Sequence, residues 1–173
     1  TIKAEDGRIA TVDVNSAEVA NQEGNANIFY KGIEQNNWDY LDSVYDGLWN
    51  AGTEYDPVKS EYDPCPSGWR VPTYAELISL TQNHSDCVVV DDGKIGYWFS
   101  GLSSYTSEVS QIFLFNAGSR SNAGHCNDRG WSGRYRASNS TVSCLYFNNN
   151  GIVDVWKDGD SRANGYSVRC VQE

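Results

Sequence analysis

The stretch YDPCPSGWRVPTYAEL, residues 62–77, sets a cysteine between two prolines and then opens a helix. The prolines fix φ and remove backbone donors, so Cys65 lies on a rigid, extended segment rather than inside a strand. Thr73 and Glu76 have the S/T-x-x-E spacing of a capping box, and the apolar residues after them predict a helix that ends near Asn83. The segment predicts a fixed entry into one helix and leaves open what Cys65 is for.

The composition of the chain favours strands and turns over helices. It has 173 residues, enough for one domain and too few for two, and 13% of them are aromatic. The absence of methionine marks Thr1 as a processed or truncated start, and no apolar run is long enough for a membrane-spanning helix. We expect a lead-in segment over residues 1–27, with one strand and a short helix after Asn15, and one domain over residues 28–173.

Past the predicted helix, the hydrophobic pattern takes the period of strands. Residues 87–100, CVVVDDGKIGYWFS, predict a hairpin around Asp-Asp-Gly-Lys. The run QIFLF, residues 111–115, predicts a strand that is buried on both faces. Three further runs over residues 143–148, 152–161 and 165–172 predict a small antiparallel sheet with one face exposed to water.

Charge and cysteine spacing exclude several classes of function. The formal net charge of −10 repels a phosphate backbone, and the basic residues form no stripe, so we expect no nucleic-acid partner. The five cysteines include no C-x-x-C pair and the two histidines are far apart, which argues against a zinc site. An odd number of cysteines leaves at least one thiol unpaired or paired between chains. Disulfides among the others would be compatible with an oxidising compartment.

Six motifs carry a resemblance to a known family. YDPCPSGWRVPTYAEL, GYWFSG, IFLFNAGSR, GRYRAS, LYFNNNG and RANGYSVRCV occur in the order found in the major paralogous (FISUMP) domain of Bacteroidetes surface proteins. That family includes variable proteins of diversity-generating retroelements and tip adhesins of pili, and the similarity covers residues 28–171. It implies an α+β, C-type lectin-like fold with short antiparallel strands, one or two short helices and long loops. It also implies a secreted or cell-surface location in a bacterium, on the outer membrane or a pilus.

The resemblance implies a use for Cys65. The helical region and the last strand lie side by side in that fold, so a disulfide between Cys65 and Cys170 is expected. Two buried free thiols are the alternative. A second bridge between Cys126 and Cys144 stays open, as does the state of Cys87.

The resemblance also implies a binding face over residues 125–162. This chain has Tyr-Arg-Ala-Ser at residues 135–138 where family members read Tyr-Trp-Ser-Ser. Positions that point outward are expected to contact the ligand, and Trp131 and Trp156 are the foremost of them, unless either folds into the core. The predicted ligand-binding residues are His125, Asn127, Asp128, Arg129, Trp131, Arg136, Tyr146, Asn148, Asp154, Trp156, Lys157, Asp158 and Asp160.

We therefore expect a non-catalytic, adhesin-like binding domain without a cofactor or a bound metal. Its partner would be a protein or glycan on another cell or surface. The alternative is a structural subunit that packs against other pilus subunits. The run GWSGR fails the nucleophile-elbow motif at its last position, and KDGDS is typical of a turn rather than of a catalytic carboxylate pair. The aspartates do not have EF-hand spacing, although a structural calcium at the long loops stays open.

Overall fold

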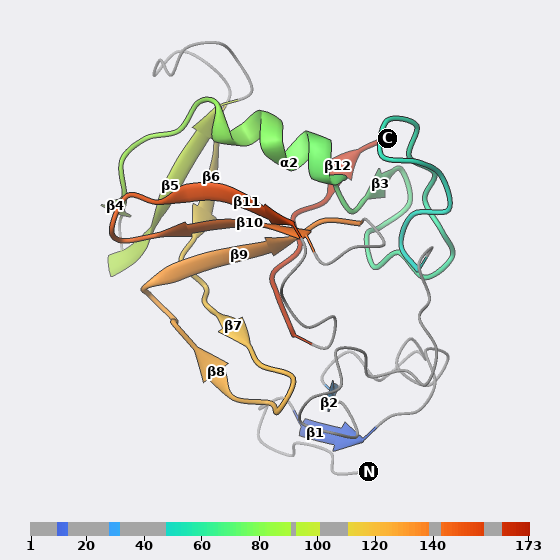
Figure 1. Ribbon diagram of the computed structural model, residues 1–173, viewed down its shortest axis with the longest axis horizontal. Coiled ribbons are helices and arrows are strands. Elements are labelled where there is room, and N and C mark those ends of the chain that lie inside the picture. Colours follow the sequence, from blue (N-terminus) through green and yellow to red (C-terminus); the bar gives the residue numbers. More distant parts are fainter. Residues whose placement is uncertain are drawn as a thin grey trace.

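The computed structural model shows a β-rich chain with one helix among the residues that it describes (Figure 1). These are residues 10–13, 28–31, 48–90, 93–100, 111–138, 143–157 and 164–173, and only the backbone is described for residues 10–13, 28–31 and 157. The predicted short helix after Asn15 lies outside them. The elements, in chain order, are β1 (Ala10–Asp13), β2 (Ile28–Lys31), β3 (Trp69–Arg70), α2 (Tyr74–Thr81), β4 (Val88–Val90), β5 (Lys94–Ser100), β6 (Gln111–Phe115), β7 (Ser119–Arg120), β8 (Cys126–Asn127), β9 (Ser132–Arg136), β10 (Ser143–Asn148), β11 (Val153–Lys157) and β12 (Val171–Gln172).

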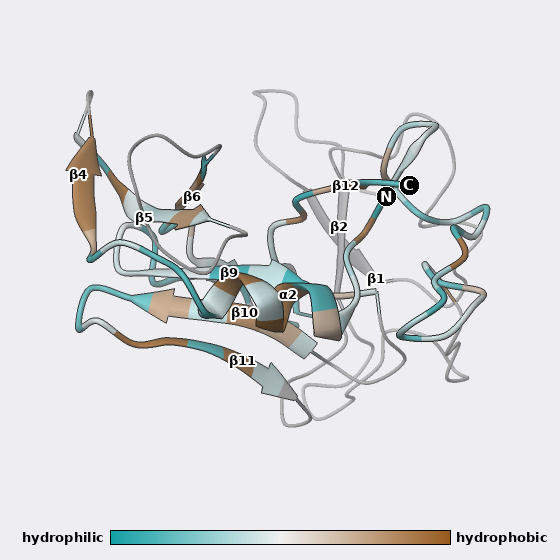
Figure 2. Ribbon diagram, turned by 90° about the horizontal axis from the view of Figure 1, so that it is seen from above, coloured by the Kyte–Doolittle hydropathy of each residue, from teal (hydrophilic) through white to brown (hydrophobic). Residues whose placement is uncertain are grey.

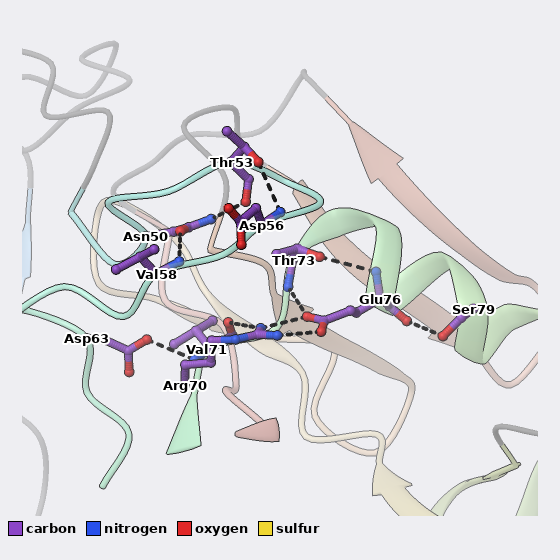
Figure 3. A network of polar contacts seen from close by, with 10 residues as sticks. All are labelled: Asn50, Thr53, Asp56, Val58, Asp63, Arg70, Val71, Thr73, Glu76 and Ser79. Atoms are coloured by element: carbon purple, nitrogen blue, oxygen red, sulfur yellow. Dashed lines mark hydrogen bonds and ion pairs between the residues drawn. The ribbon is translucent and has the colours of Figure 1, made fainter. Parts of the chain in front are cut away.

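Helix α2 begins where the capping motif predicts, which confirms that prediction. The Thr73 hydroxyl accepts a hydrogen bond from the Glu76 backbone N–H at 3.3 Å, and the Glu76 carboxylate accepts one from the Thr73 N–H at 2.8 Å. The capping box therefore satisfies two backbone donors that the first turn of a helix leaves open. Figure 3 shows both bonds at the start of the helix.

A polar network connects α2 to the segment before it (Figure 3). Arg70 makes a two-point contact with Glu76, at 2.7 Å and 2.6 Å, and this contact lowers the pKa of Glu76 below its ordinary value of 4.5. The buried carboxylate of Asp63 accepts hydrogen bonds from the backbone N–H groups of Cys65 and Val71, at 2.8 Å and 2.9 Å. These contacts hold the extended segment around Cys65 in one conformation.

The disulfide between Cys65 and Cys170 is present and spans 105 residues of chain. Next to it, β12 pairs antiparallel with β3, so the C-terminus lies beside the start of α2 (Figure 1). The bridge therefore holds the two ends of the segment 65–170 together. Cys126 and Cys144 do not form a second disulfide, since Cys126 is exposed on β8 and Cys144 is buried on β10.

Two three-stranded antiparallel sheets supply most of the core. One has the order β11–β10–β9 and the other the order β4–β5–β6. The β4–β5 pair confirms the predicted hairpin. The prediction that β6 is buried on both faces is wrong, because Leu114 alone among its five residues is buried and Phe115 at its end is exposed. Strand β4 is apolar along its length and lies at the opposite edge (Figure 2).

The core lies between α2 and the inner faces of these two sheets. Phe147 on β10 is fully buried and packs against Tyr97 and Tyr135, with ring centroids 5.2 Å and 5.8 Å apart. A Cβ at Gly133 would lie 2.2 Å from the Phe147 ring, so only glycine fits there. The buried apolar residues of the core are Leu77, Tyr97, Phe99, Leu114, Tyr135, Ala137, Leu145, Phe147 and Val155.

The predicted C-type lectin-like fold is wrong as stated. The described strands form small separate sheets of two or three strands, and the mixture of strands with one helix is compatible with an α+β class but not diagnostic of that fold. The predicted tail sheet also lacks its last strand. The backbone of residues 164–170 pairs with β7 and β9 only through isolated bridges, and regular strand pairing resumes only at β12. Alternation in the sequence cannot show which neighbour a short strand will pair with.

Helix α2 has eight residues, and the described part of the chain contains no helix that is long and apolar enough to cross a membrane.

Candidate functional site

The outer face of the β9–β10–β11 sheet is the candidate site. Alternation along each strand turns Tyr135, Leu145 and Val155 to the core and their neighbours to the other face. Register then aligns two rows of outer-face residues across the three strands. The rows are Arg134, Tyr146 and Asp154, and Arg136, Cys144 and Trp156.

Five side chains on and beside this face make the arginine–aromatic cluster, which consists of Arg134, Arg136, Tyr146, Trp156 and Tyr166. The rings of Tyr146 and Trp156 stack with centroids 4.0 Å apart and planes 23° apart. The Arg134 guanidinium carbon lies 5.3, 5.1 and 5.6 Å from the centroids of Tyr146, Trp156 and Tyr166. Arg136 lies 4.7 Å from Tyr166. Ring stacking and the close approach of both guanidinium groups to the rings therefore hold the cluster together.

The distances place Arg134 beside the ring stack and not on top of it. Its guanidinium carbon is almost equally far from the Tyr146 and Trp156 centroids, which are themselves 4.0 Å apart. A group on the free face of Trp156 would be much closer to Trp156 than to Tyr146. Tyr146 thus covers one face of the indole, and we infer that the 40% exposure of Trp156 comes from the opposite face and the ring edge.

Hydrogen bonds fix the buried members of the cluster. Asn148 donates to the Tyr146 hydroxyl at 2.8 Å, and Arg134 donates to the Tyr166 hydroxyl at 3.2 Å. Arg136 donates to the backbone carbonyl of Asn164 at 2.8 Å. The exposed indole therefore packs against side chains that hydrogen bonds already hold in place. Little conformational entropy is lost when a ligand contacts it.

A second exposed tryptophan, Trp131, lies on the turn between β8 and β9. The turn includes Asp128 in a left-handed conformation with φ of 57°. Asn116 donates to the Trp131 carbonyl at 3.1 Å, and Asn149 donates to the Gly130 carbonyl at 3.2 Å. The backbone of the turn is thus held by two side-chain amides, while the Trp131 side chain is 46% exposed.

The structure brings some of the predicted binding residues together and separates others. Arg136, Tyr146, Asn148, Asp154 and Trp156 share the outer face, but Arg136, Tyr146 and Asn148 are buried there, and only Asp154 and Trp156 are exposed. A separate group of exposed residues lies on and around β8 and on the turn that leads into β9: His125, Asn127, Asp128, Arg129 and Trp131. The side chains of Lys157, Asp158 and Asp160 lie outside the described residues.

Trp131 and Trp156 do not form one contact surface. Trp131 precedes Ser132 at one end of β9, whereas Trp156 aligns through Cys144 with Arg136 at the other end. The four residue steps from Ser132 to Arg136 correspond to about 13 Å along the strand.

Two members of the cluster, Arg134 and Tyr166, are not among the binding residues predicted from the sequence. The sequence does contain a signal for Arg134: it is two residues from the predicted binding residue Arg136 and so lies on the same face of a strand. Tyr166 had none, since it comes from a segment that joins the sheets only through isolated bridges.

The shifted pKa values do not indicate a nucleophile or a general base. Burial raises the pKa of the Cys87 thiol, which donates a hydrogen bond to Asn149 at 3.5 Å, and it raises the pKa of Tyr97 to about 12. Both shifts favour the neutral form, which is the poorer nucleophile or base. Among the described residues, no group of three His, Cys, Asp or Glu side chains is arranged to hold a metal ion.

The chain was compared with models of protein families, with curated proteins and with solved structures, and none of the three comparisons found a match.

Proposed function

We propose that this chain is a non-catalytic binding module that is displayed outside the cell and contacts its ligand through the outer face of β9–β10–β11. The observation that carries the proposal is the environment of Trp156, whose ring stacks on Tyr146 with centroids 4.0 Å apart while the residue remains 40% exposed. Immobilised tryptophans with arginine neighbours are typical of the residues that supply most of the energy at binding interfaces. The ligand is a protein or a glycan on another cell or surface.

Display outside the cell is supported by two features. The disulfide between Cys65 and Cys170 is of a kind that persists in oxidising compartments. The order of the sequence motifs resembles that of the FISUMP domains of Bacteroidetes surface proteins. If the chain is also a variable protein of a diversity-generating retroelement, its genome carries a near-identical repeat of the 3′ coding region whose differences fall at adenines.

A screen of the full chain on glycan and protein arrays tests the binding function. Trp156→Ala removes the open indole, and Trp69→Ala is the matched control because Trp69 is 42% exposed and lies on β3, beside the C-terminal strand. We expect array signals that Trp156→Ala abolishes and Trp69→Ala keeps. Signals that survive Trp156→Ala at full strength, in a protein that remains folded, would place the binding surface elsewhere.

A structural role in an assembly is the second candidate, and the β4–β5–β6 sheet favours it. Val89 and Phe115 on this sheet are exposed, and Phe115 packs against Phe113 with centroids 5.0 Å apart. Exposed apolar side chains on an edge strand are typical of surfaces that pack against another subunit. Sedimentation of the full chain at rising concentration would then show association that Val89→Ser with Phe115→Ser reverses, and a monomer at every concentration would count against self-assembly.

A further inference from the structure

We propose that the open face of Trp156 and the carboxylate of Asp154 form a subsite for an uncharged sugar ring. This inference rests on the proposed binding function and names the class of ligand for the same face. It depends on three features of the site: the free face of the indole, the polar groups around it, and the charges next to it.

The indole offers an apolar surface of a size that suits a single sugar ring. One face of Trp156 is covered by Tyr146, and Arg134 lies beside the stack, so the free face is flat and held in place. The axial C–H groups of a pyranose make one side of the ring apolar, and that side stacks on an aromatic face. Contact on a ring that is already fixed costs little side-chain entropy.

Two polar groups at the edge of this surface can bind the hydroxyl groups of a sugar. Asp154 is exposed and lies two residues before Trp156 on the same face of β11, which corresponds to about 7 Å along the strand. One of its carboxylate oxygens accepts the Val155 N–H at 2.7 Å, and this bond orients the group. The indole Nε1–H of Trp156 takes part in none of the hydrogen bonds found among the described residues. A carboxylate acceptor and an N–H donor beside an aromatic face suit a ligand that has both hydroxyl donors and acceptors.

Charged groups of both signs lie around the subsite, so a ligand with a net charge of either sign meets at least one group of like charge, whereas an uncharged ligand meets none. A cation on the open indole would lie close to Arg134, whose guanidinium carbon is 5.1 Å from the ring centroid, and to Arg136 in the same row of the sheet. An anion would meet the exposed carboxylate of Asp154 on a chain whose formal net charge is −10.

The test is a titration of the ¹⁵N-labelled full chain with neutral methyl hexopyranosides and neutral oligosaccharides, followed at the tryptophan indole N–H signals. Sulfated and sialylated oligosaccharides form the anionic arm. The variants are Trp156→Ala, Trp156→Tyr and Asp154→Asn, with Trp69→Ala as the control because its exposure of 42% is close to the 40% of Trp156. Trp156→Tyr keeps a ring on the sheet, so it tests the site even if Trp156→Ala destabilises the strand.

We expect a neutral saccharide to shift the Trp156 indole signal in a saturable manner. Trp156→Ala should lower the affinity at least about tenfold, Asp154→Asn about three- to tenfold, and Trp156→Tyr less than Trp156→Ala. Trp69→Ala should leave the affinity within about twofold of the unmodified chain.

Three results would overturn the inference, and they separate it from the proposed function. A protein partner that depends on Trp156, with no saccharide bound, would leave the binding function intact and remove the sugar subsite. Binding of the anionic arm alone would contradict the assignment of an uncharged ligand. Binding of neutral saccharides that is unaffected by all three variants would move the sugar site to another surface.

Discussion

Removal of the disulfide should cost this chain a large part of its stability. In the chain-entropy model, a bridge that closes a loop of 105 residues destabilises the unfolded state by about 4.7 kcal/mol. The free energy of unfolding of a typical domain is about 5–15 kcal/mol, so the loss is a large part of the total. We predict that Cys65→Ala with Cys170→Ala lowers the free energy of unfolding by about 3–5 kcal/mol.

Urea unfolding of the full chain, followed by tryptophan fluorescence, measures this loss. Cys126→Ala is the control, because Cys126 is exposed and outside the bridge, and it should change the free energy of unfolding by less than about 0.5 kcal/mol. Reduction of the unmodified chain should reproduce the double variant. A double variant within about 1 kcal/mol of the unmodified chain would refute the view that the bridge fastens the ends of the domain.

Three further predictions concern the groups whose contacts or pKa values the structure explains. Arg70 lowers the folded-state pKa of Glu76, so the stability that the ionised Glu76 contributes is complete above the unfolded value of 4.5 and is lost as the pH falls through the folded value; Glu76→Gln should therefore flatten the fall of the melting temperature below pH 4.5. Burial raises the pKa of Tyr97 from 10.0 to about 12, so the stability that it contributes is complete below pH 10.0 and is lost as the pH rises toward about 12. Tyr97→Phe should weaken that alkaline loss in the same melting assay, and an unchanged slope would contradict the assignment. Arg134→Lys should lower the free energy of unfolding by about 1–2 kcal/mol in urea, whereas the exposed Arg129→Lys should be neutral, and equal effects would mean that the ring contacts of Arg134 contribute nothing.

Local signals in the sequence predicted local structure well. Thr73 and Glu76 mark the start of α2 because a capping box is formed by residues three positions apart. The Asp-Asp-Gly-Lys run predicts the β4–β5 hairpin because a tight turn fixes which strands pair. The bridge between Cys65 and Cys170 was expected from the resemblance of motifs, since cysteine spacing alone leaves the pairing open.

Properties that depend on distant neighbours could not be predicted in the same way. Alternation along β10 places Tyr146 on the outer face, but it does not show that Trp156 and Arg134 cover it. The apolar run of β6 indicates a strand, but it does not show that β6 lies at a sheet edge with Phe115 exposed. Sequence position also suggested one surface with two tryptophans, whereas the register of β9 with β10 and β11 places Trp131 at the opposite end from Trp156.

The most direct test of the central claim compares two free energies for a single variant. For Trp156→Ala, both the loss of affinity for the strongest array ligand and the loss of unfolding free energy are measured, with Trp69→Ala as the reference. We predict that affinity falls at least about tenfold while the free energy of unfolding falls by less than about 1.5 kcal/mol, the value of one ring stack. Unchanged affinity together with a loss of stability above about 3 kcal/mol would show that Trp156 serves the core and that the outer face of β9–β10–β11 is not where this protein binds.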